Sequence, residues 1–290
     1  MAYHSIKEIL DYCSIHKKKF YEAVLDDDMD ERKVSREESQ KQMYAMWDAM
    51  VLASASYDPF IHSASRLVGG QGAAMEEYRK KGGTLCGDYL NQVIQQALEM
   101  GESNACMKRI VAAPTAGACG VLPAVLIPFF RSGNADHEQI IEALYVAAGI
   151  GQVIASRAFI AGAAGGCQAE VGAASSMAAG ALTALKGGTN EQIAHAGAMA
   201  LKSLLGLVCD PVAGLVEVPC VKRNVIGAVN AMSCADMALA GITSAIPADQ
   251  VFDAMREVGE KMHDSLRETG EGGLAATKEG ISVAKKLSRK

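Results

Sequence analysis

Aromatic residues and an excess of positive charge are both lacking in this chain of 290 residues. Aromatic side chains make up 5% of the sequence although half of it is hydrophobic, so small and aliphatic side chains must fill the core. That composition favours closely packed helices. The net charge of −5 argues against a nucleic-acid surface, because phosphate binding needs a concentrated positive field. The short basic clusters at 17–19 and 285–290 are expected to be solvated ends of helices.

A secretory signal and an uninterrupted membrane span are lacking as well. The N-terminal stretch MAYHSIKEILDYC has no apolar segment that ends in small residues, so we expect a cytoplasmic protein. In that reducing compartment the eight cysteines are expected to be free, metal-bound or catalytic. Residues 110–130 carry no charge over about the length of a bilayer span, but three prolines and two glycines interrupt them. We therefore predict a buried loop followed by a helix, and no membrane span.

Alternation with a period of two is absent, so no sheet is predicted and the fold class is all-α. One amphipathic helix is expected from residue 5 to about 26, followed by the charged linker DDDMDERK. Ser35 and Glu38 form a capping-box pattern that starts the next helix. Further helices are expected over 88–100, 136–157, 168–186, 190–205, 222–243 and 248–265. We expect a single all-helical domain over 1–290, with N-terminal helices in 1–57 and the functional region in 58–290.

Common catalytic motifs are missing: there is no phosphate-binding loop, no Ser-His-Asp order and no C-x-x-C pair. The stretch GLVCDPVAGLVEVPC instead places Cys209 and Cys220 in a loop that its prolines and glycines keep from being helical. Cys167 is expected at the start of a helix, where a thiolate is stabilised. Three such thiols suit a structural zinc site or an iron–sulfur cluster, and their spacing does not decide between the two.

The remaining cysteines and the histidines give weaker indications. Cys13 and Cys234 lie on helical, apolar stretches and are expected to be buried packing residues, as are Cys86 and Cys106 beside a predicted helix. Cys119 lies in the loop PTAGACG, whose texture is that of a binding loop. Among the histidines, His62 and His195 are the two that could line a site.

Three segments carry a resemblance to a known family: APTAGACGVLPAVL, GGCQAEVGAASSMAAGAL and GLVCDPVAGLVEVPCVKRN. They resemble the alpha chain of the bacterial iron–sulfur-dependent L-serine dehydratases, from about residue 60 onward. The resemblance implies an all-helical catalytic domain with a [4Fe-4S] cluster on Cys167, Cys209 and Cys220, and it makes Cys119 a neighbour of that cluster. It also implies conversion of L-serine to pyruvate and ammonia without pyridoxal phosphate, with the serine hydroxyl on an open iron.

Substrate-binding candidates follow from the resemblance together with the hydroxyls and exposed amides that the residues offer. They are Ser63, Ser65, Gly69, Gly70, Thr115, Ala116 and Gly117. The catalytic base is not identified. Family members in one chain carry a further domain with a Ser-His-Thr segment and a C-terminal cysteine, and neither is found here, so a separate beta subunit and an oligomer are expected. The alternatives are a related lyase acting on L-cysteine and a non-catalytic subunit with a structural metal.

Overall fold

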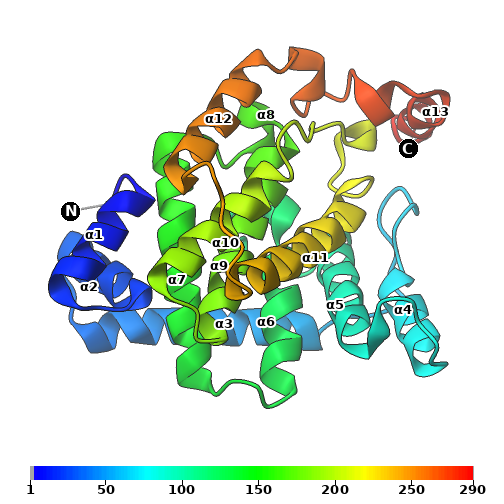
Figure 1. Cartoon of the computed structure of the whole chain (residues 1–290). Coiled ribbons are helices and arrows are strands. Elements are labelled where there is room, and N and C mark those ends of the chain that lie inside the picture. Colours follow the sequence, from blue (N-terminus) through cyan, green and yellow to red (C-terminus); the bar gives the residue numbers. More distant parts are fainter. Residues whose placement is uncertain (1–2, 290) are drawn as a thin grey trace.

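The computed structural model describes residues 3–289 and is all-α, as predicted (Figure 1). The helices are α1 (Ile6–His16), α2 (Phe20–Arg32), α3 (Arg36–Ala55), α4 (Gln71–Lys80), α5 (Gly87–Ala105), α6 (Val121–Arg131), α7 (His137–Arg157), α8 (Gly162–Gly165), α9 (Ala173–Leu185), α10 (Asn190–Lys202), α11 (Cys220–Leu239), α12 (Ala248–Lys261) and α13 (Lys278–Leu287). Short 3-10 turns cover Ala116–Ala118, Val212–Gly214, Asp264–Leu266 and Gly273–Ala276, and a π turn covers Gln168–Gly172. The predicted helices from residue 88 onward are confirmed, with ends that differ by a few residues.

The N-terminal region differs from the prediction. Where one helix was expected, the chain forms α1 and α2, because Lys17 adopts a left-handed conformation (φ 53°) that ends α1. The expected linker DDDMDERK is wrong, since residues 26–32 continue α2, which ends only where Lys33 turns left-handed. The helix start at Ser35 is confirmed, because its hydroxyl accepts a hydrogen bond from the Glu38 amide.

Helix α9 is the centre of the molecule and is packed against α6, α7, α10 and α11 (Figure 1). Its residues from Ala173 to Thr183 are all buried. Small side chains allow this close approach: a Cβ atom at Gly180 would lie 2.2 Å from Cδ1 of Ile150 on α7. Buried residues of α1–α3 belong to the same hydrophobic core as α9. The expected division of the chain into N-terminal helices (1–57) and a functional region (58–290) stays a prediction.

The uncharged segment 110–130 is folded into the core, as predicted. Its loop and 3-10 turn lead into α6, in which every residue from Val121 to Phe129 is buried. Pro123 is tolerated because the first turn of a helix has no internal partner for that amide, whereas Pro128 lies inside the helix.

Among the described residues one helix, α7, has the length and composition of a bilayer span. Most of its apolar window (61%) is buried inside the fold, and α7 packs against α2 and α9, which is the position of a core helix.

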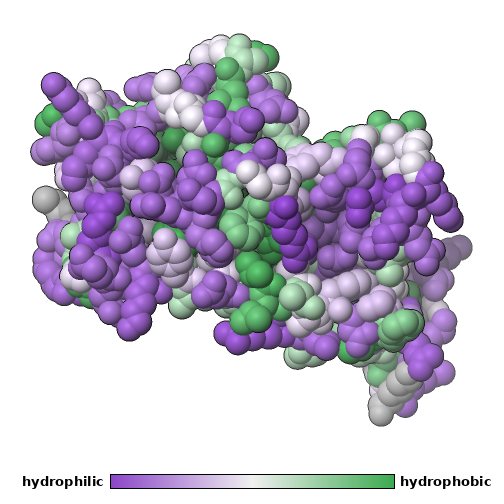
Figure 2. Space-filling model, turned by 90° about the horizontal axis from the view of Figure 1, so that it is seen from below, coloured by the Kyte–Doolittle hydropathy of each residue, from purple (hydrophilic) through white to green (hydrophobic). Residues whose placement is uncertain are grey.

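On the face of the molecule seen from below, hydrophobic side chains form a strip across the middle with hydrophilic side chains on both sides (Figure 2).

Candidate functional site

The three predicted metal-binding cysteines come from three separate segments and are all buried. Cys167 immediately precedes the π turn, as expected for the start of a helix. Cys209 lies in the loop after α10 and is held on both sides, because its amide donates to the Leu266 carbonyl (2.8 Å) and its carbonyl accepts from the Glu268 amide (2.7 Å). Cys220 is the first residue of α11, so its expected place within the loop is wrong by one residue. Their exposed fractions are 2%, 3% and 7%.

The three thiols lie close enough together for Cys167 to affect the ionisation of both others. Burial raises the pKa of Cys167 to about 11 and that of Cys220 to about 12, and the neighbouring Cys167 adds to the rise at Cys220. Burial also raises the pKa of Cys209, and both other thiols contribute. Within residues 3–289 no group of three or more His, Cys, Asp or Glu side chains is placed to hold a single metal ion. Because burial raises their pKa, the three cysteines form a buried set of protonated thiols that lie close together.

One positive charge faces this set. The guanidinium of Arg223, one turn into α11, forms an ion pair with Asp210 (2.8 Å) and donates to the Val208 carbonyl (2.6 Å). It also interacts with Cys167 and opposes the rise of that thiol's pKa. Arg223 therefore connects the loop on either side of Cys209 to the helix that begins at Cys220.

Glu170, in the π turn, is a carboxyl group that raises the pKa of all three cysteines. A Cβ atom at Gly162 would lie 2.8 Å from both Cys209 Sγ and Glu170 Oε2, so these two groups share one wall. The Thr115 hydroxyl donates to Glu170 Oε1 (2.6 Å). Burial raises the pKa of Glu170, and the hydrogen bond from Thr115 opposes that rise. A carboxyl group in this position can hold a cation or exchange a proton beside the thiols.

The PTAG loop lies against Glu170 and α11. A Cβ atom at Gly117 would lie 2.8 Å from Glu170 Oε1, which explains why glycine is needed there. Asn224 of α11 holds the loop by donating to the Gly117 carbonyl (2.9 Å), and Asn104 of α5 donates to the Ala116 carbonyl (3.1 Å). Thr115, Ala116 and Gly117 are therefore beside the cysteine set.

The serines of the predicted substrate segment also lie near the loop that carries the cysteines. The hydroxyl groups of Ser63 (2.7 Å) and Ser65 both donate to Glu217 Oε2, three residues before Cys220. Glu217 is 4% exposed. Both serine hydroxyls thus have a partner within the chain, and they tie the segment from 58 to 70 to the cysteine loop.

The glycines of the same segment have a different environment. The amide of Gly69 donates to Glu102 Oε1 (3.2 Å), and the amides of Gln71 (2.8 Å) and Gly72 (3.1 Å) donate to the same carboxylate. Gly70 has a left-handed backbone (φ 73°) and caps α4. The amides at the start of α4 therefore already surround an anion that the chain itself provides.

The remaining cysteines and the two candidate histidines differ in how far they are buried. Cys13, Cys119 and Cys234 are buried and Cys106 is half-buried. Cys86, which caps the start of α5, is exposed, so its expected packing role is wrong. His62 is exposed next to Gly69. His195 on α10 accepts a hydrogen bond from the Ser244 amide (3.3 Å).

Four charged residues at the site were missed by reasoning from the sequence. They are Glu170, Asp210, Glu217 and Arg223. Glu170 could have been found, because it is the single charged residue in the run of small residues GGCQAEVGAASSMAAG. The other three lie within three residues of Cys209 or Cys220. Charged side chains are common at such positions, so nothing in the sequence marks these three as residues of the site.

Comparisons with known proteins identify the family of the chain. The family profile described as "Serine dehydratase alpha chain" matches residues 15–275. The chain is 45% identical to a probable L-serine dehydratase, alpha chain, of Bacillus subtilis, over 98% of this chain and 95% of that protein. It is 42% identical to an L-serine dehydratase, alpha chain, of Peptoniphilus asaccharolyticus, over 97% and 96% of the two chains. It is 44% identical to the L-serine dehydratase TdcG of Escherichia coli over 65% of this chain and 41% of that protein. The chain belongs to the serine dehydratase alpha chain family.

Proposed function

We propose that the chain catalyses the conversion of L-serine to pyruvate and ammonia with a [4Fe-4S] cluster held by Cys167, Cys209 and Cys220. The observation that supports it is the set of three buried thiols from three separate segments, in which Cys167 raises the pKa of both Cys209 and Cys220 and the carboxyl of Glu170 acts on all three. The proposal includes a separate beta chain, assembly into an oligomer and a cytoplasmic location. The alpha-chain names of the two full-length relatives support the second chain.

The donor set fits an iron–sulfur cluster. Thiolates are the usual ligands of such clusters, and each binds a different iron, so the three sulfurs need not converge on one ion. Three thiolates in an apolar site would repel one another, and a cationic iron core together with Arg223 would offset that repulsion. When bound, the cluster would supply an iron with an open position, a Lewis acid that stabilises negative charge on the departing hydroxyl group of serine.

The chain's own residues would bind and orient the amino acid. Thr115, Ala116 and Gly117 lie beside Glu170, and Ser63 and Ser65 lie beside the cysteine loop, so both groups are candidates for holding the substrate carboxylate. To bind it, the serine hydroxyls would have to exchange their hydrogen bonds to Glu217. The carboxyl group of Glu170 is suited to the substrate ammonium, because it is half-buried and lies beside Cys209. Burial of the surrounding wall limits the access of water, which strengthens these contacts.

The test is anaerobic reconstitution of the full chain with iron and sulfide, with and without a co-expressed beta chain. We expect about four irons per chain and pyruvate formation from L-serine that exceeds formation from L-cysteine. Cys209→Ser should lose the cluster, whereas Cys234→Ser, which changes a buried thiol on α11, should keep it. One equivalent of zinc with no pyruvate, or serine turnover that survives Cys209→Ser, would contradict the proposal.

A further inference from the structure

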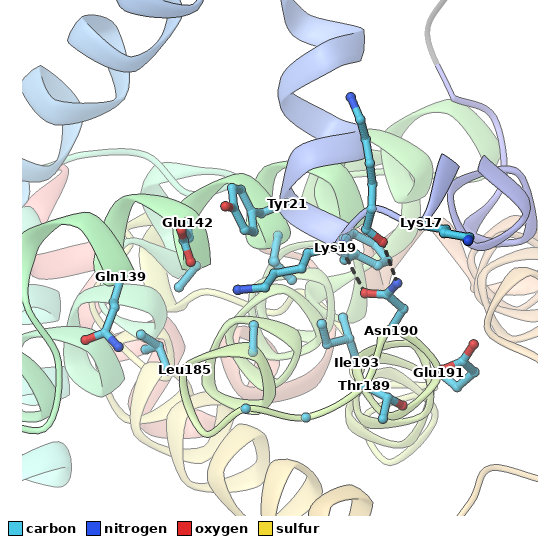
Figure 3. A pocket seen from close by; sticks show the side chains of 17 residues that line it. Lys17, Lys19, Tyr21, Gln139, Glu142, Leu185, Thr189, Asn190, Glu191 and Ile193 are labelled. Atoms are coloured by element: carbon cyan, nitrogen blue, oxygen red, sulfur yellow. Dashed lines mark hydrogen bonds between the residues drawn. The ribbon is translucent and has the colours of Figure 1, made fainter. Parts of the chain in front are cut away.

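A cavity lies outside the site described above. It has a volume of about 600 Å³ and is formed by the turn between α1 and α2, by α7 and by the turn between α9 and α10 (Figure 3). None of the residues of the cysteine site line it. In Figure 1, α1 and α2 lie at one end of the molecule and the loop before α11 lies toward the other. A volume of this size is within the usual range for small-molecule sites, roughly 300–1,000 Å³.

Two side chains of opposite charge face each other across this cavity. The ammonium group of Lys19 points into it, toward the side of the cavity where Tyr21 and Glu142 lie (Figure 3). Lys19 Nζ lies 5.8 Å from the centre of the Tyr21 ring. Burial and a hydrogen bond to Glu142 raise the pKa of Tyr21 to about 12, so its hydroxyl remains a donor to that carboxylate.

The other charged groups in the lining are directed elsewhere. Lys18 forms an ion pair with Asp26, outside the cavity. The ammonium of Lys17 and the carboxylate of Glu191 point away from the cavity in Figure 3. The lining therefore presents one cation and one anion to a ligand, which favours a zwitterion over a simple anion.

Backbone amides are already satisfied at this place. The Phe20 amide, at the start of α2, donates to Asn190 Oδ1 (2.8 Å), and Asn190 Nδ2 donates to the Lys18 carbonyl (3.1 Å). The start of α10 is capped by Thr189. The remaining lining includes the polar side chain of Gln139 and an apolar part. The apolar part is contributed by Ala143, Val146, Ala184, Leu185 and Ile193. A cation and an anion for the two charged groups of a ligand therefore lie next to an apolar wall for its uncharged part.

We propose that this cavity is a second binding site, for a free α-amino acid with an apolar side chain. Its carboxylate binds Lys19, its ammonium group binds Glu142, and its side chain packs against the apolar wall formed by α7, α9 and α10. The site does not depend on the cluster or on the reaction at the cysteines, so it can be tested separately from the proposed function.

The test is isothermal titration of the full chain with L-leucine as the probe. We expect saturable binding that 4-methylpentanoate, which lacks the ammonium group, and isopentylamine, which lacks the carboxylate, fail to reproduce. Lys19→Met and Glu142→Gln should each weaken binding of leucine at least about tenfold, because each removes one charged hydrogen bond. Lys17→Met is the matched control, since it removes a lining lysine whose ammonium points outward, and it should leave the affinity unchanged.

Three results would overturn the proposal. The first is the absence of saturable binding up to about 10 mM leucine, which corresponds to less than about 3 kcal/mol. The second is binding of either analogue as tightly as leucine, since only one of the two charges would then be read. The third is equal loss of affinity in Lys17→Met and Lys19→Met, which would indicate a general effect of positive charge.

Discussion

Single buried residues determine how the chain responds to pH when no cluster is bound. Cys119 is completely buried, and burial raises its pKa from 9 to about 12. In the unfolded chain the same thiol ionises near pH 9. Because the folded state holds the proton more tightly, the stability of the fold is fully present below pH 9 and falls as the pH rises toward 12.

The variant Cys119→Ala isolates this effect, since it removes the thiol without adding a charge. Between pH 8 and pH 10.5, the free energy of unfolding of the original chain should fall by about 2 kcal/mol more than that of the variant, since one unit of pKa shift corresponds to about 1.4 kcal/mol. Urea unfolding of the cluster-free chain at the two pH values measures it. Parallel curves for the two proteins would show that Cys119 ionises equally in both states.

At the scale of elements, the start of α4 depends on a carboxylate from α5. Glu102 is 2% exposed and accepts hydrogen bonds from the Gly69, Gln71 and Gly72 amides and from the Tyr57 hydroxyl (2.6 Å). An anion in this place satisfies amides that the first turn of a helix leaves unpaired, and it interacts favourably with the helix dipole.

Glu102→Gln should therefore destabilise the fold by about 3 kcal/mol, because a side-chain NH₂ group cannot accept from the amides it would face. The matched control is Glu99→Gln on the same helix. Burial raises the pKa of Glu99, so loss of its charge should cost less than about 1 kcal/mol. Urea unfolding at pH 7 compares the two variants, and equal losses would mean that Glu102 acts only through its bulk.

The elements themselves could largely be predicted from the sequence. Helix periodicity and capping residues depend on neighbours along the chain, and Ser35 is an example that the structure confirms. The division between α1 and α2 could not be predicted, because it needs a left-handed Lys17 and the contact between Phe20 and Asn190, which are 170 residues apart. The three cysteines were found because prolines and glycines mark their loops.

At the scale of the molecule, the site is assembled by contacts that no local pattern encodes. Ser63 meets Glu217 across 154 residues, and Thr115 meets Glu170 across 55. These pairs depend on how α4, α5, α9 and α11 pack. The acidic residues of the site therefore could not be predicted from the sequence, whereas the cysteines could be proposed from it. The same packing brings the C-terminal segment back to the cysteine loop.

Asp210 joins these two parts of the molecule through its side chain, next to the backbone hydrogen bonds of Cys209. Its Oδ1 pairs with Arg223, and its Oδ2 accepts a hydrogen bond from the Leu274 amide (2.8 Å). The backbone at Gly273 approaches so closely that a Cβ atom there would lie 2.4 Å from Oδ2. The C-terminal segment is thus held directly on the residue that follows Cys209.

Asp210→Ala should release the segment from 268 to 277 to proteases and lower the free energy of unfolding by about 3–5 kcal/mol, because it leaves the half-buried Arg223 without its partner. Limited proteolysis and urea unfolding of the full chain measure the two effects. Asp264→Ala is the control. The side chain of Asp264 is 81% exposed, so its ion pair with Arg267 should contribute less than about 1 kcal/mol to the free energy of unfolding. Unchanged protection of the segment in Asp210→Ala would show that α13 holds itself in place through its own contacts with the turn at Val212–Gly214.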